Sequence, residues 1–181
     1  MKSMIRTLFI VILCICSAVA CVDSNRTKIE RLMRTQLKIP AELSDSTSVI
    51  NIIRYIKPKS CTSCELDLGM WRIYNKNLYK KFGDRATVKF IVETTNVKET
   101  VKLLSMYNFR DYSFVDSIGI FIQDNPNISD IGSDVVMLVD NHKNIILIGN
   151  PCKDIEIQHI VDSIINEHVI SIYNPTNDMC F

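Results

Sequence analysis

Cys61 and Cys64, separated by two residues, are placed to form a reversible dithiol centre. They follow an apolar, strand-like run at residues 49–56 and precede a long amphipathic stretch, so the first sulfur is expected where a helix begins. The unpaired amides of a helix N-terminus lower the pKa of a thiol. The second sulfur lies one helical turn further on, near enough to close a disulfide. The pair therefore predicts a site that can be oxidised and reduced.

Two other interpretations of the cysteine pair stay open. One is a permanent structural disulfide, although closing so short a loop stabilises a protein little. The other is a zinc site, in which Cys152, Cys180 or a histidine would have to complete the ligands that Cys61 and Cys64 supply. The sequence has no second CxxC motif and no HxxxH motif. We expect no metal and no bound cofactor.

The N-terminal segment has the composition of a secretory signal. Lys2 and Arg6 precede an apolar run at residues 8–15, and small residues follow directly before Cys21. This arrangement resembles a bacterial lipobox, which implies cleavage before Cys21 and attachment of lipid to its sulfur. Cleavage at the same place by an ordinary signal peptidase, leaving Cys21 as a free cysteine, is the alternative. The apolar run is too short to span a bilayer comfortably.

The remaining residues have the size and composition of one domain. We divide them into a lipid-anchored linker and helix, residues 21–44, and a folded domain, residues 45–181. The full sequence has 21 basic and 20 acidic residues, and without Lys2 and Arg6 it has 19 basic ones and a formal net charge of −1. With this balance, and with no basic cluster among aromatic residues, we expect no nucleic-acid partner.

The apolar pattern predicts the elements that hold the cysteine pair. Helical spacing is found in four segments, at residues 25–38, 61–82, 97–107 and 157–165. Apolar runs of strand length are found at residues 49–56, 88–92, 135–139 and 145–148, the last two joined by a turn. Residues 109–131, rich in Asp, Ser and Asn, give no clear pattern. The predicted order is an N-terminal helix, then a βαβ unit, then a helix and a ββα unit.

This order, with the CxxC motif at the end of the first core strand, resembles thioredoxin topology. The sequence is similar to the thioredoxin-like lipoproteins of the bacterial cell envelope, relatives of the redoxin and cytochrome c maturation thiol oxidoreductases. The resemblance rests on residues 60–71, 136–140 and 146–151 and extends over about residues 45–168. It implies an α/β thioredoxin-like fold: a central mixed β-sheet flanked by helices, with an N-terminal helical extension.

The resemblance also implies a function. Cys61 would attack protein disulfides as a thiolate, favoured by nearby Lys57 and Lys59, and Cys64 would resolve the mixed disulfide. An upstream reductant or oxidant would be the second partner. The protein would be anchored by its lipid in the bacterial cell envelope, facing the periplasm or the cell exterior. A non-catalytic binding or assembly lipoprotein on the same fold is the alternative. A thiol peroxidase is less favoured, because the threonine and arginine motif of those enzymes is not found.

One position departs from the family pattern. A cis-proline usually precedes the third core strand and faces the CxxC motif, and the equivalent position here is Asp134. A carboxylate that faces Cys61 would raise the pKa of its thiol and slow the exchange, unless Asp134 points to solvent. Cys152, at the head of the closing helix, is not expected to act as a third redox cysteine. It could instead pair with Cys180.

Overall fold

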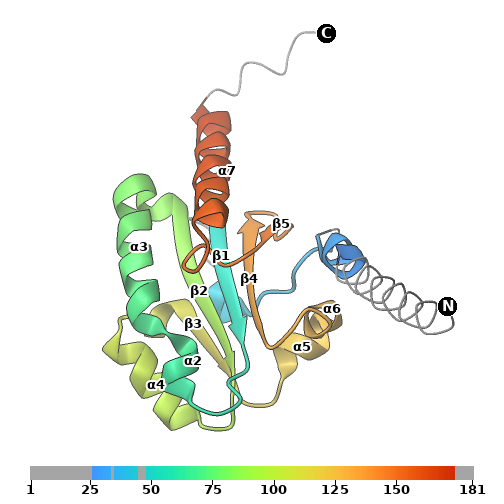
Figure 1. Cartoon of the computed structure of the whole chain (residues 1–181), viewed down its shortest axis with the longest axis vertical. Helices are drawn as coiled ribbons and strands as arrows, with labels where there is room; N and C mark the ends of the chain where they lie inside the picture. Colours follow the sequence, from blue (N-terminus) through green and yellow to red (C-terminus); the bar gives the residue numbers. More distant parts are fainter. Residues whose placement is uncertain (1–25, 34, 45–47, 174–181) are drawn as a thin grey trace, which may run out of the picture.

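A five-stranded mixed sheet forms the centre of the molecule (Figure 1). The structure, a computed structural model, describes residues 26–33, 35–44 and 48–173; the expectations for residues 1–20, Cys21 and Cys180 lie outside them. The strands are β1 (Ile50–Ile56), β2 (Ala86–Glu93), β3 (Ser113–Asp116), β4 (Asp134–Asp140) and β5 (Ile145–Ile148). They lie in the order β3-β2-β1-β4-β5, with β1, β2 and β3 parallel and β4 antiparallel to both β1 and β5. The predicted strands and the β4–β5 hairpin are confirmed.

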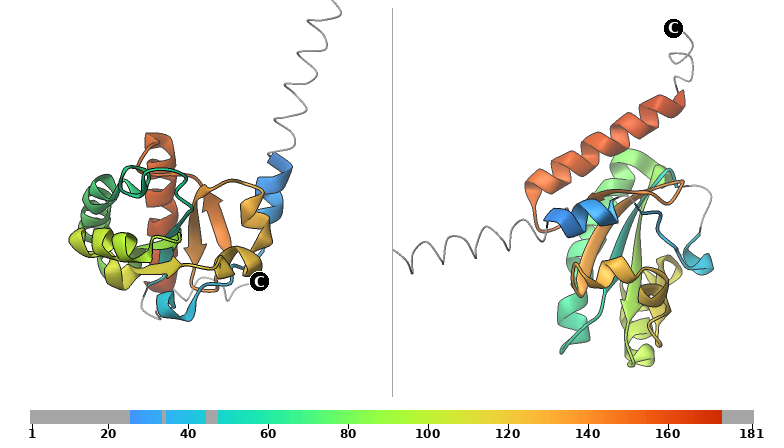
Figure 2. Two further views of the ribbon diagram at one scale, coloured as in Figure 1. Left: turned by 90° about the horizontal axis from the view of Figure 1, so that it is seen from below. Right: turned by 90° about the vertical axis from the view of Figure 1, so that its right-hand side faces the viewer.

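Helices cover both faces of the sheet. After a first helix at residues 26–32, the α-helices are α2 (Thr62–Leu66), α3 (Leu68–Phe82), α4 (Val97–Met106), α5 (Ile120–Asp124), α6 (Pro126–Ser129) and α7 (Ile155–Tyr173). Three single 3₁₀ turns are η1 (Ala41–Leu43), η2 (Gly83–Arg85) and η3 (Arg110–Tyr112). Figure 2 shows α2, α3, α4 and α7 on one side of the sheet, and the first helix, α5 and α6 on the other.

The alternation of side chains along β1 divides the core in two. Ile52 and Ile56 point into the cluster beneath α3, α4 and α7, whereas Ile53 and Tyr55 point into the cluster beneath the first helix, α5 and α6. All seven residues of β1 are buried. A central strand covered on both faces needs apolar residues at most positions, which explains the largely apolar run in the sequence.

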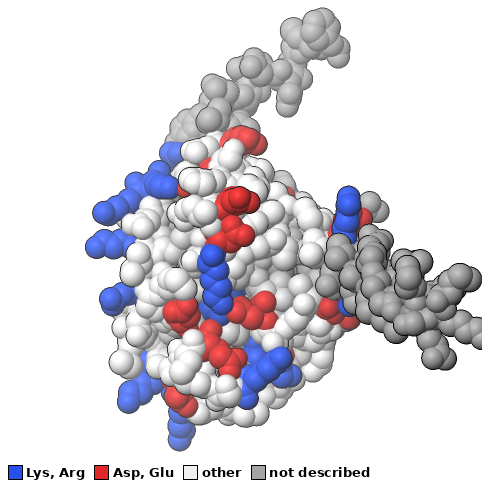
Figure 3. Space-filling view, viewed as in Figure 1, with Lys and Arg blue, Asp and Glu red and all other residues white. Residues whose placement is uncertain are grey.

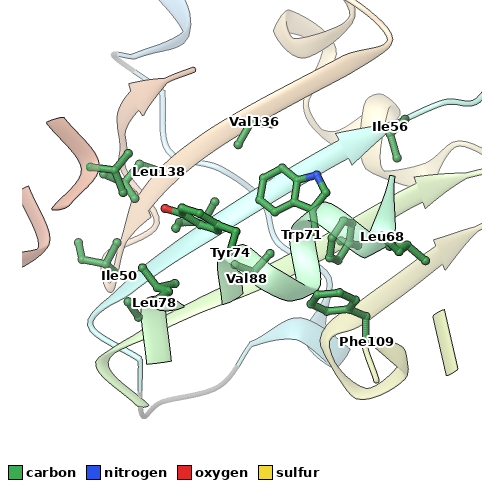
Figure 4. Packing of buried hydrophobic residues seen from close by; sticks show 14 of the residues in the cluster. Ile50, Ile56, Leu68, Trp71, Tyr74, Leu78, Val88, Phe109, Val136 and Leu138 are labelled. Atoms are coloured by element: carbon green, nitrogen blue, oxygen red, sulfur yellow. The ribbon is translucent and has the colours of Figure 1, made fainter. Parts of the chain in front are cut away.

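Trp71 of α3 lies at the centre of the first cluster. Its ring makes edge-to-face contacts with Tyr74 and Phe90, with centroid distances of 5.8 and 5.6 Å. Figure 4 shows Trp71 and Tyr74 directed from α3 towards the sheet, together with Leu68 and Leu78. The opposite face of α3 is solvated, and basic side chains project along this edge of the molecule (Figure 3). This amphipathic packing fixes α3, and with it the chain that enters α3 from the cysteine pair.

The predicted helix at 61–82 is in fact two helices. Asp67, in the left-handed conformation with φ 49° and ψ 40°, separates α2 from α3. The carbonyls of Glu65 and Leu66 at the end of α2 accept hydrogen bonds from buried Arg54. In an unbroken helix these carbonyls would accept backbone amides of the next turn; here the Arg54 side chain donates to them instead. The apolar spacing of the sequence does not reveal this break.

Two further predictions need correction. Within the described residues the N-terminal helix ends at residue 32 rather than at 38, because Gln36 forms a β-bridge with Asn144 and the Leu37 amide donates to Lys143 O at 2.8 Å. Residues 109–131, which gave no pattern, contain β3, α5 and α6. These elements have only four or five residues each, too few for a period to be recognised.

Candidate redox site

Cys61 and Cys64 form a disulfide at the carboxyl end of β1. Their Cα atoms are 5.3 Å apart, within the range that a disulfide requires. Cys61 is the N-cap of α2, with an extended backbone at φ −106° and ψ 101°. Its sulfur accepts the amide N–H of Cys64 at 3.3 Å. The strand end and the following helical turn thus bring the two sulfurs together, as the spacing predicted.

Both cysteines reach the surface. Cys61 is half-buried and Cys64 is exposed. The hydroxyl of Ser63 lies 3.4 Å from the Cys61 sulfur, near the Cys64 amide that also points to it. When the disulfide is reduced, these two groups can donate hydrogen bonds to a thiolate on Cys61. The geometry therefore favours Cys61 as the charged sulfur of the pair.

Glu65 holds the loop that leads into the pair. Its carboxylate accepts the backbone amides of Lys59 and Ser60, at 2.9 and 2.8 Å, and the Ser60 hydroxyl at 3.0 Å. Hydrogen bonds from the Lys59 and Ser60 amides lower the pKa of this carboxyl below its usual value, although the group is exposed. The loop and the first turn of α2 are therefore joined by one side chain. The sequence pattern does not indicate this role, since it shows only an acidic residue in the first turn of a helix.

Arg54 lies beneath α2, on the face of β1 that also carries Ile52 and Ile56. Its side chain is fully buried, with 0% of its surface exposed. Besides the α2 carbonyls it binds both carboxylate oxygens of Asp134, at 2.8 and 2.9 Å, and its guanidinium lies 5.6 Å from the centre of the Trp71 ring. The apolar pattern of the sequence does not indicate Arg54 as a residue of the site. The available signal was a charged side chain inside an apolar strand.

Asp134 is the first residue of β4 and is paired with Ile56 at the end of β1. Its carboxylate binds Arg54, so its negative charge is matched by a guanidinium and does not stand alone near the cysteines. All peptide bonds of the described residues are trans. The expected slowing of exchange by Asp134 stays a prediction, with Arg54 now its nearest charged partner.

Lys57 and Lys59 are placed differently from each other. Lys57 forms an ion pair with Glu93 at 2.5 Å, and Glu93 also accepts the Tyr55 hydroxyl at 2.7 Å. Burial, the hydrogen bond to Glu93 and its charge raise the pKa of Tyr55 well above the usual range. The positive charge of Lys57 is thus balanced by Glu93. Both lysines line an open cleft of about 440 Å³ between the end of β1 and the β3–α5 connection.

Cys152 carries a free, half-buried thiol, and its suggested partner Cys180 lies outside the described residues. Burial raises the pKa of Cys152 to about 12, and the nearby Arg54 guanidinium counters this only in part. A thiol with so high a pKa is protonated at neutral pH and reacts slowly. That Cys152 does not act as a third redox cysteine stays a prediction.

The described residues bring together no group of three or more His, Cys, Asp or Glu side chains that could hold a metal ion. Within the same residues, no helix combines the length and apolar character needed to cross a membrane.

Comparison with known proteins identifies the fold. The chain has a thioredoxin-like fold: it superposes on a thioredoxin-like protein from Bacteroides caccae with a TM-score of 0.51 and 11% identity, over 80% of this chain and 53% of that one. A thioredoxin-like protein solved in its oxidized form gives a TM-score of 0.50 and 12% identity, over 72% of this chain and 86% of that one. At such identities the likeness establishes the fold alone.

No protein-family model matches the sequence, and a search of curated proteins finds no similar one. The expected thioredoxin-like fold is therefore confirmed by structure rather than by sequence. Its Cys61–Cys64 disulfide lies at the end of the first strand, where the predicted topology placed it.

Proposed function

We propose that this protein catalyses thiol–disulfide exchange on protein disulfides through Cys61 and Cys64. The observation that carries the proposal is their disulfide at the carboxyl end of β1, with both residues in contact with solvent. A permanent bridge of this kind would close a loop too short to stabilise the fold much. An accessible bridge between neighbouring cysteines is instead suited to opening and closing.

The exchange proceeds in two steps. The Cys61 thiolate attacks one sulfur of a substrate disulfide; that S–S bond breaks, the departing sulfur leaves as a thiolate, and a mixed disulfide forms with Cys61. Cys64, once deprotonated, attacks the Cys61 sulfur and releases the second substrate sulfur. The substrate gains two electrons and, after protonation, two thiols, while Cys61 and Cys64 become a disulfide. A dithiol partner then reduces the pair again, and no cofactor is needed.

The proposed location is the bacterial cell envelope, with the protein anchored through lipid on Cys21. Its support is the signal-like segment before Cys21 and the small residues beside it. Exported proteins meet conditions in which disulfides form and persist, which gives a CxxC pair substrates of the required kind. The mass of the mature N-terminal peptide tests this proposal, because an acylated Cys21 adds the mass of its lipid and Cys21→Ser abolishes that addition.

The test of activity is reduction of insulin disulfides by the full chain, with dithiothreitol as electron donor. We expect the wild-type protein to exceed the rate of dithiothreitol alone, and Cys61→Ser to abolish that excess. Cys64→Ser should stop turnover and accumulate a mixed disulfide on Cys61. The matched control is Cys152→Ser, which should retain full activity because its thiol is protonated. A wild-type rate equal to that of dithiothreitol alone would overturn the proposal and favour a binding or assembly role.

A further inference from the structure

We propose that Arg54 is the positioning residue of the redox pair: by holding the carboxyl end of α2, it keeps Cys61 and Cys64 where their disulfide closes. This inference rests on the proposed function, in that it concerns the same two cysteines. It assigns the stability of their disulfide to a side chain that contacts neither sulfur in the hydrogen bonds of the described residues.

The helix that carries the cysteines cannot hold its shape alone. α2 has five residues, far fewer than an isolated helix needs in water, and the left-handed Asp67 separates it from α3. It must therefore be held at both ends. At its start, Glu65 binds the Lys59 and Ser60 amides. At its end, the holding group is Arg54.

The contacts of Arg54 at this end are directional. Nη1 donates to Leu66 O at 2.5 Å, and Nη2 donates to Glu65 O at 2.7 Å. On the other side, the Asp134 carboxylate and the Trp71 ring fix the plane of the guanidinium. Arginine has five donors in a rigid plane, whereas lysine has three on a single nitrogen. Only arginine can hold α2 and the start of β4 together in this way.

The equilibrium between a dithiol and its disulfide favours the disulfide in proportion to the effective concentration of one thiol near the other. This effective concentration rises when the chain holds the two thiols in the bonding geometry. If α2 frays, that concentration falls and the dithiol is favoured. The charge of Arg54 acts less, because Asp134 balances it. Loss of Arg54 should thus make the Cys61–Cys64 disulfide easier to reduce.

The experiment equilibrates the full chain with mixtures of reduced and oxidised dithiothreitol. Dithiothreitol gives up two electrons and two protons and closes to its cyclic disulfide, while the protein disulfide opens to two thiols. Trapping with a thiol reagent and peptide mass analysis report Cys61 and Cys64 separately from Cys152. We expect Arg54→Met to favour the dithiol at least tenfold, which is a shift of about 30 mV to a less negative potential.

Arg54→Lys should give nearly the same shift, although it keeps the charge beside Asp134. The matched control is Arg72→Met, the same substitution at an exposed arginine of α3 that lies over the Tyr107 ring, and it should leave the equilibrium unchanged. If Arg54→Met does not fold, the dithiothreitol equilibrium of Arg54→Lys tests the inference. A folded variant at position 54 with the wild-type equilibrium constant overturns the inference, as does full rescue by lysine.

The redox equilibrium and the catalytic rate are separate measurements, so the failure of one proposal can be told apart from the failure of the other. A shift on Arg54→Met together with no insulin reduction by the wild type would leave the positioning role standing and remove the enzyme. Insulin reduction by the wild type together with an unshifted Arg54→Met equilibrium would support the enzyme and remove the positioning role of Arg54.

Discussion

The carboxylate of Asp134 and the guanidinium of Arg54 face each other as two parallel hydrogen bonds, Oδ1 to Nε at 2.8 Å and Oδ2 to Nη2 at 2.9 Å. The pair joins β4 to β1 diagonally, since Arg54 lies opposite Val136 in the strand register. A forked arginine–carboxylate contact is stronger and more directional than a single ion pair. The main partner of the Asp134 carboxylate, which the sequence predicted to lie near the cysteines, is therefore the buried Arg54 guanidinium.

Asp134→Ala should destabilise the protein, because it leaves the fully buried Arg54 charge without its carboxylate and with only two carbonyls and the Trp71 ring as partners. We expect a loss of about 2 kcal/mol in the free energy of unfolding. The loss is smaller than for a fully buried ion pair, because the Asp134 side chain is 35% exposed. Urea denaturation measures it. The control, Glu30→Ala, removes an exposed ion pair with Arg26 and should cost no more than about 0.5 kcal/mol. Equal losses for the two variants would contradict the prediction.

Asp116→Asn should loosen the connection from β3 to α5. The Asp116 side chain, in a residue only 1% exposed, accepts four backbone amides, those of Ile118, Gly119, Ile120 and Phe121. An asparagine has one acceptor oxygen and turns an NH₂ group towards one of these donors. We expect a cost of about 2 kcal/mol and faster exchange of these amide hydrogens. Asp111→Asn, at an exposed position nearby, is the control and should change neither quantity.

Alkylation of Cys152 in the folded protein should be slow and should depend steeply on pH. With a thiol pKa of about 12, the thiolate fraction at pH 8 is about 10⁻⁴, so the rate should rise about tenfold per pH unit. Because burial raises this pKa above the usual 9.0, the neutral thiol's contribution to stability is full below about pH 9 and is lost as the pH rises towards 12. Equal alkylation rates for Cys152 in folded and urea-unfolded protein at pH 8 would refute this.

Glu65→Gln should free the loop before Cys61. In the wild type the pKa of Glu65 is lowered by the Lys59 and Ser60 amides, so its stabilisation of the loop is present above about pH 4.5 and is lost as the pH falls through the lowered value. The chemical shifts of those two amides should report this titration by NMR. Glu65→Gln should remove the pH dependence and speed their hydrogen exchange. Glu156→Gln, at an exposed position of α7, should leave both unaltered.

Two glycine substitutions should act in opposite directions. A Cβ on Gly149 would meet two carbons of Ile157 at 3.0 Å, so Gly149→Ala should push α7 from the sheet and cost about 1 kcal/mol. A Cβ on Gly69, within α3, would meet only Tyr107 at 3.8 Å. Gly69→Ala should therefore stabilise the helix by about 0.5 kcal/mol. Thermal unfolding midpoints measure both, and a rise for Gly149→Ala would contradict the first.

The sequence predicted the elements whose pattern is long and regular. Strands β1, β2, β4 and β5, helix α3 and the closing helix were found from their apolar patterns. β1 is buried along its whole length, and α3 buries one apolar face against the sheet. The spacing of Cys61 and Cys64 likewise predicted their disulfide. These features depend on residues close together in the chain, and a local pattern is sufficient to recognise them.

What the sequence by itself determined is the thioredoxin-like order of strands and helices and the position of the cysteine pair at the end of β1. Only the tertiary structure decided that Arg54 and Asp134, 80 residues apart, are partners, and that Arg54 ends α2. It also decided the break at Asp67 and the elements β3, α5 and α6. The physical reason is that hydrogen bonds to a buried charge form between whichever segments the fold brings together, and such contacts leave no period along the chain.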